Sequence, residues 1–216
     1  VQNEGVIVAE YGGVNMGAGR TATVDFDGDG LLRFEVDGEV LENAAGVDAA
    51  VANKGEIRAN GGEILLTASA AQDVFDHVIN NEGVIEAGRI DNSGGEIRLV
   101  GIGGGEVISS GTVDASGKTD GDTGGTVHLL GEKVGLVGSA VVDASGAAGG
   151  GTVLVGGDRE GANPDIRNAT ATYVGGDAAV HADALSDGDG GKLIVYADDT
   201  ARVHGTLTAR GGAEAG

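Results

Sequence analysis

The sequence predicts an all-β protein built as a parallel β-helix, a solenoid of stacked coils. Seven times along the chain a branched apolar residue is followed two places later by alanine. The pairs are Ile7/Ala9, Ile57/Ala59, Ile85/Ala87, Val113/Ala115, Val142/Ala144, Val180/Ala182 and Leu207/Ala209. Most of them recur at roughly 28-residue intervals, within the range of solenoid repeats. Residues i and i+2 share one face of an extended strand, so the repeated unit is a β-coil.

A second strand is expected after each of these pairs, because a Gly-Gly pair followed by alternating apolar residues recurs. The Gly-Gly pairs are Gly12-Gly13, Gly61-Gly62, Gly94-Gly95, Gly124-Gly125, Gly150-Gly151 and Gly190-Gly191. A weaker third strand is indicated in several coils, around Val107, Val134, Tyr173 and Val203. Two or three short strands per turn, separated by loops of variable length, are typical of a parallel β-helix.

The residue two places before each branched anchor is small, as expected where backbones approach closely. These residues are Gly5, Gly55, Gly83, Gly111, Ala140, Ala178 and Gly205. In three coils an asparagine stands two places before that glycine, at Asn3, Asn53 and Asn81. Asparagine bonds its own turn backbone, and stacked asparagines can form a ladder between coils.

Two segments, residues 38–51 and 68–80, break the strand pattern. Their apolar residues are spaced as on a helix: Val40, Ala44, Val47 and Val51 in the first, and Ala71, Phe75, Val78 and Ile79 in the second. We therefore expect short helical excursions packed on the coils. Before the first of them, Thr23–Phe26 and Leu31–Val36 predict a pair of strands.

Composition supports a folded solenoid. Glycine supplies 44 of 216 residues, yet 40% of residues are hydrophobic and cysteine is absent. Disordered segments lack apolar residues, so the high glycine content does not indicate disorder. A β-sandwich or barrel would show Asn-Gly or Asp-Gly turns between paired alternating strands, and the few such dipeptides here do not divide strands in this way.

The charge balance bears on partners. The chain has 13 basic and 34 acidic residues and a formal net charge of −21, which repels nucleic acid and anionic lipid. No apolar run reaches the roughly 18–20 residues of a membrane span. We therefore expect no nucleic-acid partner and no membrane insertion. Absence of cysteine suits a chain that crosses an oxidising space unfolded.

We expect residues 1–216 to form a single β-helix segment of about seven to eight coils. A free solenoid needs polar caps, and neither end offers one. The segment is therefore expected to be part of a longer solenoid.

Several long runs carry a family resemblance. They are the run from Asn53, Asn-Lys-Gly-Glu-Ile-Arg-Ala-Asn-Gly-Gly-Glu-Ile-Leu-Leu, the run from Gly111, Gly-Thr-Val-Asp-Ala-Ser-Gly, the run from Val142, Val-Asp-Ala-Ser-Gly-Ala-Ala-Gly-Gly-Gly-Thr-Val-Leu-Val, and residues 183–199. These runs resemble the filamentous-haemagglutinin-like adhesins of Gram-negative bacteria, which are two-partner secretion exoproteins. The family's amino-terminal secretion domain has Asn-Pro signatures that Asn163-Pro164 does not match, so the resemblance is to the shaft region.

The resemblance implies a right-handed parallel β-helix that is secreted to the extracellular space or the bacterial cell surface. We expect a non-catalytic structural and adhesive shaft that mediates attachment, cell–cell or matrix association and biofilm formation. Its implied export partner is an outer-membrane transporter of the two-partner type, and host-cell or matrix glycans or proteins are its candidate ligands. The alternative is a carbohydrate- or matrix-polysaccharide-binding module on a β-helix.

A calcium loop is suggested by Asp25-x-Asp27-x-Asp29-Gly30, which matches the first half of an EF-hand. That loop needs a bidentate glutamate at its twelfth position, and this position is Val36. We expect instead a tight turn that joins two strands, with no metal or cofactor site. Similar turns are expected at Asp120-Gly-Asp122 and Asp187-Gly-Asp189.

Catalysis is the third candidate function, because some parallel β-helix proteins cleave polysaccharides with paired carboxylates. Asp198-Asp199 and His204 superficially resemble the aspartates and histidine of polygalacturonase-like enzymes. The Arg-x-Lys and Asn-Thr-Asp motifs of those enzymes are missing from the sequence, so we expect no catalytic residues and no enzyme.

Other polar and aromatic residues give weaker signals. The four histidines, His77, His128, His181 and His204, lack metal-binding spacing and are expected to face solvent. Tyr11, Tyr173 and Tyr196 are expected to be packing residues, although tyrosines can stack on sugar rings. An ice-binding array is disfavoured because its threonine pairs would not occupy equivalent coil positions: Thr21-x-Thr23, Thr170-x-Thr172 and Thr206-x-Thr208.

The middle residue of each Ile-x-Ala unit should point outward, so that these residues stack in one column. Its members are Arg58, Glu86, Asp114, Asp143, His181 and Thr208. Arg58 beside Glu86 is favourable, whereas Asp114 beside Asp143 places like charges opposite each other. A protonated His181, a bridging calcium ion or splaying of the side chains into water would each relieve this repulsion, and splaying is the simplest.

Overall fold

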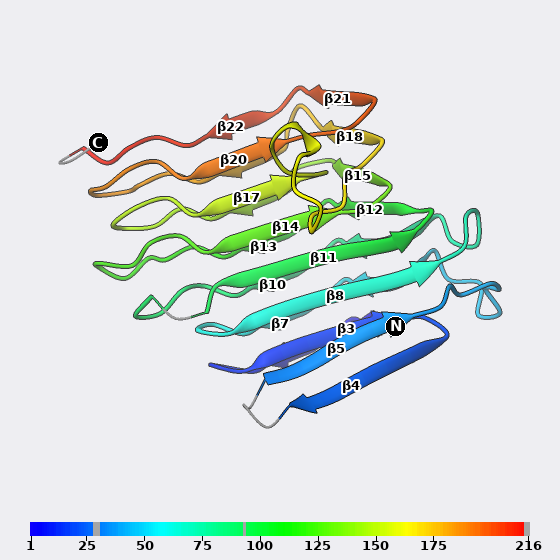
Figure 1. Ribbon diagram of the computed structural model, residues 1–216. Helices are drawn as coiled ribbons and strands as arrows, with labels where there is room; N and C mark the ends of the chain where they lie inside the picture. The colour runs from blue at the N-terminus through cyan, green and yellow to red at the C-terminus, as the bar shows by residue number, and fades with distance from the viewer. Residues whose placement is uncertain (28–30, 93, 214–216) are drawn as a thin grey trace.

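Three parallel sheets form the walls of a β-helix in the computed structural model, which describes residues 1–27, 31–92 and 94–213 (Figure 1). Sheet 1 consists of β1 (Gln2–Asn3), β6 (Ala49–Asn53), β9 (His77–Asn81), β12 (Glu106–Ser109), β15 (Lys133–Leu136), β18 (Ala171–Val174) and β21 (Thr200–Val203). Sheet 2 consists of β2 (Val6–Val8), β7 (Glu56–Arg58), β10 (Val84–Glu86), β13 (Thr112–Asp114), β16 (Val141–Asp143), β19 (Ala179–His181) and β22 (Thr206–Thr208). Sheet 3 consists of β3 (Gly13–Ala18), β8 (Glu63–Ala70), β11 (Glu96–Gly103), β14 (Thr126–Leu130), β17 (Thr152–Val155) and β20 (Lys192–Val195). The expected β-helix fold is confirmed.

The register between coils follows the sequence repeat. Each branched anchor pairs with the anchor of the next coil, from Ile7 opposite Ile57 to Val180 opposite Leu207. The Gly-Gly strands align in the same way, so that Ile64, Ile97, Val127, Val153 and Leu193 form another column. Equivalent strand residues therefore lie opposite each other in successive coils, even though the loops between the strands differ in length.

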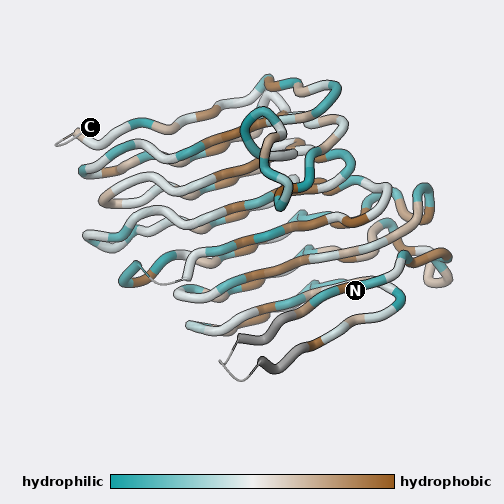
Figure 2. The backbone as a smooth tube through the Cα atoms, viewed as in Figure 1, coloured by the Kyte–Doolittle hydropathy of each residue, from teal (hydrophilic) through white to brown (hydrophobic). Residues whose placement is uncertain are grey.

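The core is a continuous filling of small and branched side chains. Ile57, Ile85 and Val113 have no exposed surface, and neither do Ala59, Ala87, Ala115, Ala144 and Ala182. In Figure 2 the most hydrophobic stretches of the chain lie on the stacked strands. The predicted inward alanine column is confirmed for these five inner coils, whereas Ala9 and Ala209 in the outermost coils are less buried.

Glycine two places before the anchor is required by the close approach of backbones in the coils that contain Gly55, Gly83 and Gly111. A Cβ atom at Gly83 would collide with the carbonyl oxygen of Gly55, and one at Gly111 would collide with that of Gly83. Parallel strands lie about 4.8 Å apart, and at this corner the backbone of one coil lies directly against the next. In these coils only glycine leaves room for that approach, whereas Ala140 and Ala178 occupy the same position in two later coils.

An internal ladder of amides runs between sheets 1 and 2, as the asparagine spacing predicted. Asn3 Nδ2 donates to Asn53 Oδ1 at 2.8 Å, Asn53 Nδ2 donates to Asn81 Oδ1 at 2.9 Å, and Asn81 Nδ2 donates to Ser109 Oγ at 3.1 Å. Asn53 and Asn81 have no exposed surface. Their second amide hydrogens reach the backbone carbonyls of Val84 and Thr112, so these buried polar groups are satisfied.

The two predicted helical excursions are wrong. Within residues 38–51, Val40 makes an isolated parallel bridge with Ala70, residues 41–48 are loop and turn, and residues 49–51 already belong to β6. Within residues 68–80 the chain completes β8, makes a turn and enters β9. Val51 and Ile79 are paired inward residues of sheet 1, so the apparent helical spacing came from strand ends on either side of a loop. The helical element in the described residues is a short 3-10 turn, η1 (Arg159–Gly161).

The predicted strand pair is confirmed as an antiparallel hairpin of β4 (Thr21–Asp27) and β5 (Leu31–Asp37). The calcium-loop candidate Asp25-x-Asp27-x-Asp29-Gly30 falls at its tip, where residues 28–30 lie outside the described residues. A Cβ atom at Gly17 of β3 would collide with Phe34 and Val36 of β5. The hairpin therefore packs on the outer face of sheet 3.

Replacing Ala115 or Ala144 by leucine should destabilise the protein by about 1–3 kcal/mol, because the coil interior is already filled. Ala179→Leu is the matched control, since Ala179 faces outward on β19 and is only half-buried. Chemical denaturation of the three variants checks this prediction. Unchanged midpoints for both inward variants would contradict the interior assignment.

Asn53→Ala should cost about 2–4 kcal/mol, because it leaves buried polar groups of Asn3 and Asn81 without partners. The control is Asn80→Ala, on the neighbouring strand, whose amide donates to the exposed Glu82. That change should cost about 0.5 kcal/mol or less. Equal effects of the two substitutions on the free energy of unfolding would show that the ladder contributes nothing specific.

Candidate functional site

The outer face of sheet 2 carries the column of side chains that the sequence predicted. The register places Arg58, Glu86, Asp114, Asp143, His181 and Thr208 on consecutive strands at one position. Arg58 Nε lies 4.0 Å from Glu86 Oε2. The column is therefore confirmed, and Arg58 lies beside Glu86 while it pairs more closely with Glu56 on its own strand.

The repulsion between Asp114 and Asp143 is relieved by a residue that the sequence analysis did not consider. Lys118 Nζ lies 2.7 Å from Asp114 Oδ2. Burial alone would raise the pKa of the Asp114 carboxyl, but hydrogen bonds from Lys118 and Ser116 outweigh it and hold that pKa below its ordinary value. His181 instead places its Nδ1 2.8 Å from Thr208 Oγ1 at the next strand.

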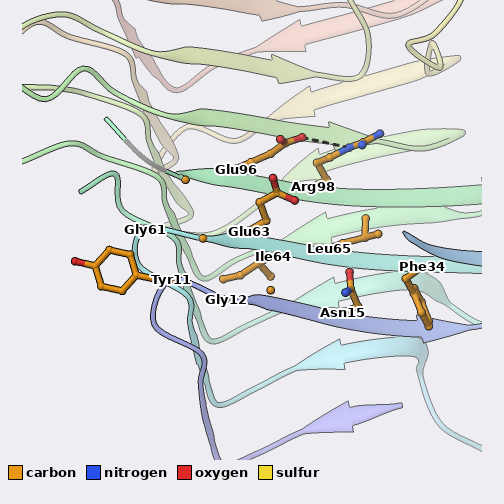
Figure 3. Close-up of a pocket in the computed structure, with 13 residues that line it drawn as sticks. Tyr11, Gly12, Asn15, Phe34, Gly61, Glu63, Ile64, Leu65, Glu96 and Arg98 are labelled. Atoms are coloured by element: carbon orange, nitrogen blue, oxygen red, sulfur yellow. Dashed lines mark ion pairs between the residues drawn. The ribbon is translucent and has the colours of Figure 1, made fainter. Parts of the chain in front are cut away.

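A groove of about 550 Å³ lies on the outer face of sheet 3, beside the hairpin (Figure 3). Its floor is formed by outward side chains of the first strands of that sheet, Asn15 of β3 and Leu65 of β8. Glu63 of β8 and the pair of Glu96 and Arg98 on β11 lie along it, with 3.8 Å between Glu96 Oε1 and Arg98 Nε. Tyr11 lies at one end and Phe34 of the hairpin at the other.

Tyr11 has an unusual backbone conformation. Its φ is 53°, in the left-handed region that favours glycine. The following coils have Gly61 (φ 72°) and Gly94 (φ 65°) at this turn, and each stacks on the preceding residue. A bulky residue in this region carries roughly 1–3 kcal/mol of strain. The Tyr11 ring lies over Gly61, where a Cβ atom would collide with it, and Tyr11 is nevertheless 67% exposed.

A second hollow of about 340 Å³ lies on the outer face of sheet 1. Its central side chains are Ile108 and Tyr173, with Gly135 between them on the middle strand. The rings of Tyr173 and His204 lie 5.8 Å apart at an angle of 54°. Tyr173 is 43% exposed, and the hollow is shallower than the groove beside the hairpin.

The residues considered for catalysis do not converge. Asp198 Oδ1 accepts a hydrogen bond from Asn168 Nδ2 at 3.3 Å, and its charge contributes to a raised pKa of Tyr196, after desolvation of that phenol. His204, at the other end of β21, packs against Tyr173. Asp198 thus serves to hold the loop that contains η1, and the expected absence of catalytic residues remains a proposal.

The other sequence candidates are placed as follows. His204 is exposed as expected, whereas His77, His128 and His181 are half-buried on their strands, and the pKa of His128 is lowered by burial and by the charge of Arg98. Asp122 is 98% buried and its Oδ1 accepts from the Asn92 backbone N–H at 2.7 Å. Within residues 1–27, 31–92 and 94–213, no group of three or more His, Asp and Glu side chains is arranged to hold a metal ion.

Sequence reasoning missed the groove because the hairpin closes it at one end, although its floor residues Asn15, Leu65 and Arg98 share one register position of the repeat. Leu65 and Arg98 were recognised only as strand residues, and Phe34 belongs to an insertion that has no counterpart in other coils. One signal was available: Tyr11 occupies a turn position that is glycine at Gly61 and Gly94. An aromatic residue at a position that is glycine in the next two coils indicates that the outer surface of the first coil differs from theirs.

The fold and the outward columns define a β-helix with polar ladders on its surface and one groove beside a hairpin. Neither protein-family models nor curated protein sequences give a match to this chain. Among solved structures, the chain is similar to the crystal structure of the HMW1 secretion domain from Haemophilus influenzae, with a TM-score of 0.74 and 25% sequence identity. The match covers 99% of this chain and 52% of that chain, so this chain spans about half the length of that structure.

This similarity supports a relationship with adhesins of two-partner secretion systems, in part as the sequence resemblance implied. In the part of the chain that the structure describes, no helix is long and apolar enough to cross a membrane. The assignment to a shaft is not addressed by the similarity.

Lys118→Met should raise the pKa of the Asp114 carboxyl, because it removes the ammonium group that bonds with it. It should also lower stability by about 1 kcal/mol or less, with a smaller loss at high salt, since the lysine is largely exposed. Titration of the Asp114 side chain by NMR measures the pKa. Lys133→Met, which removes a lysine paired with Glu106 on sheet 1, is the control and should leave the Asp114 titration unchanged.

Proposed function

We propose that this chain is a β-helical segment of a large exoprotein, exported through an outer-membrane transporter of the two-partner type to the extracellular space or the bacterial cell surface. There it serves as a non-catalytic structural and adhesive shaft that holds attachment surfaces away from the cell. The observation that carries this proposal is the unbroken parallel register of equivalent residues along all coils. The similarity to the HMW1 secretion domain supports the export route.

The mechanism of such a shaft is mechanical. Backbone hydrogen bonds run along the axis from coil to coil, and each coil buries its apolar residues against its neighbours. Stability is then approximately the sum of coil stabilities and nearest-neighbour interfaces, so folding can propagate from one coil to the next. A chain that emerges from a transporter in an extended form can thus fold as it emerges, with each finished coil as the template for the next.

A shaft needs no active site, cofactor or metal, and two observations favour this. The ammonium group of Lys118 already occupies the position beside Asp114 that a bridging cation would take. Asp198 is bonded with Asn168 in a loop anchor. We expect the thermal midpoint to be the same with calcium and with chelator, and we expect no release of products from acidic polysaccharides. Hydrolysis of such a polysaccharide by the purified chain would overturn this part of the proposal.

The export proposal is tested in a bacterium that carries a two-partner transporter and its matching secretion domain. In one arm the chain follows a signal peptide and that secretion domain; in the other it follows the signal peptide alone. A shaft segment should reach the medium or cell surface only in the first arm. Export in the second arm would show that the chain is itself a secretion domain.

The control for this experiment is a β-helical fragment of similar length from the transporter's own exoprotein, placed behind the same secretion domain. If that fragment is exported and this chain stays in the periplasm, the two-partner proposal is wrong. Ala144→Leu, which should weaken the stacking of coils, gives a second comparison: it should reduce the folded, protease-resistant material at the surface.

A second candidate function is carbohydrate binding, and one observation favours it. An exposed, strained tyrosine borders a groove lined by carboxylate, amide and guanidinium groups. Stacking of the coils does not require these side chains, because all of them point away from the core.

A further inference from the structure

We propose that the groove between sheet 3 and the hairpin binds an uncharged saccharide chain, with Tyr11 as its stacking platform. This inference rests on the second function proposed above. It adds the location of the site, the residues that make it and the class of saccharide that it accepts.

The shape of the groove depends on the hairpin. β5 packs over Gly17 of β3, where only the absence of a side chain leaves room for Phe34 and Val36. Phe34 therefore ends the groove on one side, while Leu65 forms an apolar part of the floor. A volume of about 550 Å³ lies within the range of small-molecule sites, about 300–1,000 Å³, and accommodates a few sugar units.

Tyr11 is the strongest indication of a ligand. Its turn can be made without strain by glycine, as at Gly61 and Gly94, yet this coil has a tyrosine whose ring is largely exposed. Backbone strain that folding does not require is typical of binding and catalytic positions. A flat aromatic ring with a polar hydroxyl group can pack against the C–H face of a sugar and bond with its hydroxyl groups.

The polar groups of the groove select the class of ligand. Glu63 and Glu96 accept hydrogen bonds, the Arg98 guanidinium donates, and the Asn15 amide does both. Sugar hydroxyl groups donate and accept, so they can satisfy all of these groups, and bonds with ionised partners are the stronger ones. An acidic saccharide would face two carboxylates and one guanidinium inside a chain with a net charge of −21.

A peptide fits this groove less well than a saccharide. Extended peptides gain most of their affinity from main-chain bonds to the free edge of a sheet. The groove lies instead on the face of β8, which pairs with β3 on one side and β11 on the other. Its contacts therefore come from side chains, as a saccharide requires.

The test compares binding of the full chain to an array of neutral oligosaccharides of glucose, galactose, mannose and N-acetylglucosamine with binding to their sialylated and sulfated counterparts. Neutral saccharides should bind and acidic ones should bind more weakly. Tyr11→Gly should lower the affinity at least about tenfold, equivalent to 1.4 kcal/mol, while its thermal midpoint stays equal to that of the wild type or rises. Tyr173→Ala, which removes an exposed tyrosine from sheet 1, is the matched control and should leave binding unchanged.

Each other outcome has a distinct meaning. If no saccharide on the array binds, the second proposed function fails and this inference with it. If neutral saccharides bind equally well to wild type and Tyr11→Gly, or if Tyr173→Ala abolishes binding, the protein binds saccharides but not in this groove. Stronger binding of the acidic counterparts, or of a lysine-rich peptide used as a competitor, would overturn the assignment to an uncharged saccharide.

Discussion

The spacing of parallel strands is the constraint on which the rest of this structure depends. Hydrogen bonds between coils fix neighbouring backbones at about 4.8 Å, and they do so at all three sheets. At the corner before the anchor, the backbones of the second to fourth coils approach so closely that Gly55, Gly83 and Gly111 cannot bear a side chain, whereas two later coils have Ala140 and Ala178 there. Because the strands keep this spacing, each strand residue lies directly beside its equivalent in the next coil. Inward and outward side chains are therefore both arranged in columns.

Stacking identical residues stabilises the interior, whereas stacking identical charges on the surface destabilises the protein. Identical amides at Asn3, Asn53 and Asn81 satisfy one another, since an amide both donates and accepts. Beyond Ser109 the same column becomes apolar, with Leu136 and Val174, so the ladder ends where a hydroxyl group accepts its last hydrogen. Identical carboxylates have no such complementarity. The repulsion between Asp114 and Asp143 is offset by Lys118, which lies outside the column, four residues after Asp114.

The parts of the fold that repeat could be predicted from the sequence, and the parts that do not repeat could not. The i, i+2 alternation shows which strand residues face inward, and the repeat of roughly 28 residues shows which strands are equivalent. Together they predicted the Ile-x-Ala and Gly-Gly strands. The segment 68–80 was misassigned since Ala71 and Phe75 approach helical spacing across a turn, and local spacing cannot distinguish this from a helix. Phe34 acts through tertiary placement, and Lys118 acts from a loop just after its strand; no repeat specifies either position.

Function in such a molecule is best sought where periodicity fails. Inward side chains pack against their equivalents in the coils on either side, so a substitution in the interior disturbs both neighbouring coils. Outward positions are free of this demand, so a departure from the repeat on the outer face needs another explanation. The loop around η1 has one, because Arg167 anchors it through the Gly103 carbonyl at 2.7 Å and Glu132 at 2.9 Å. Tyr11 packs its ring over Gly61, yet it leaves most of its surface exposed and keeps a conformation that Gly61 and Gly94 adopt freely. A strained aromatic residue that leaves most of its surface exposed is explained most simply by what it contacts from outside.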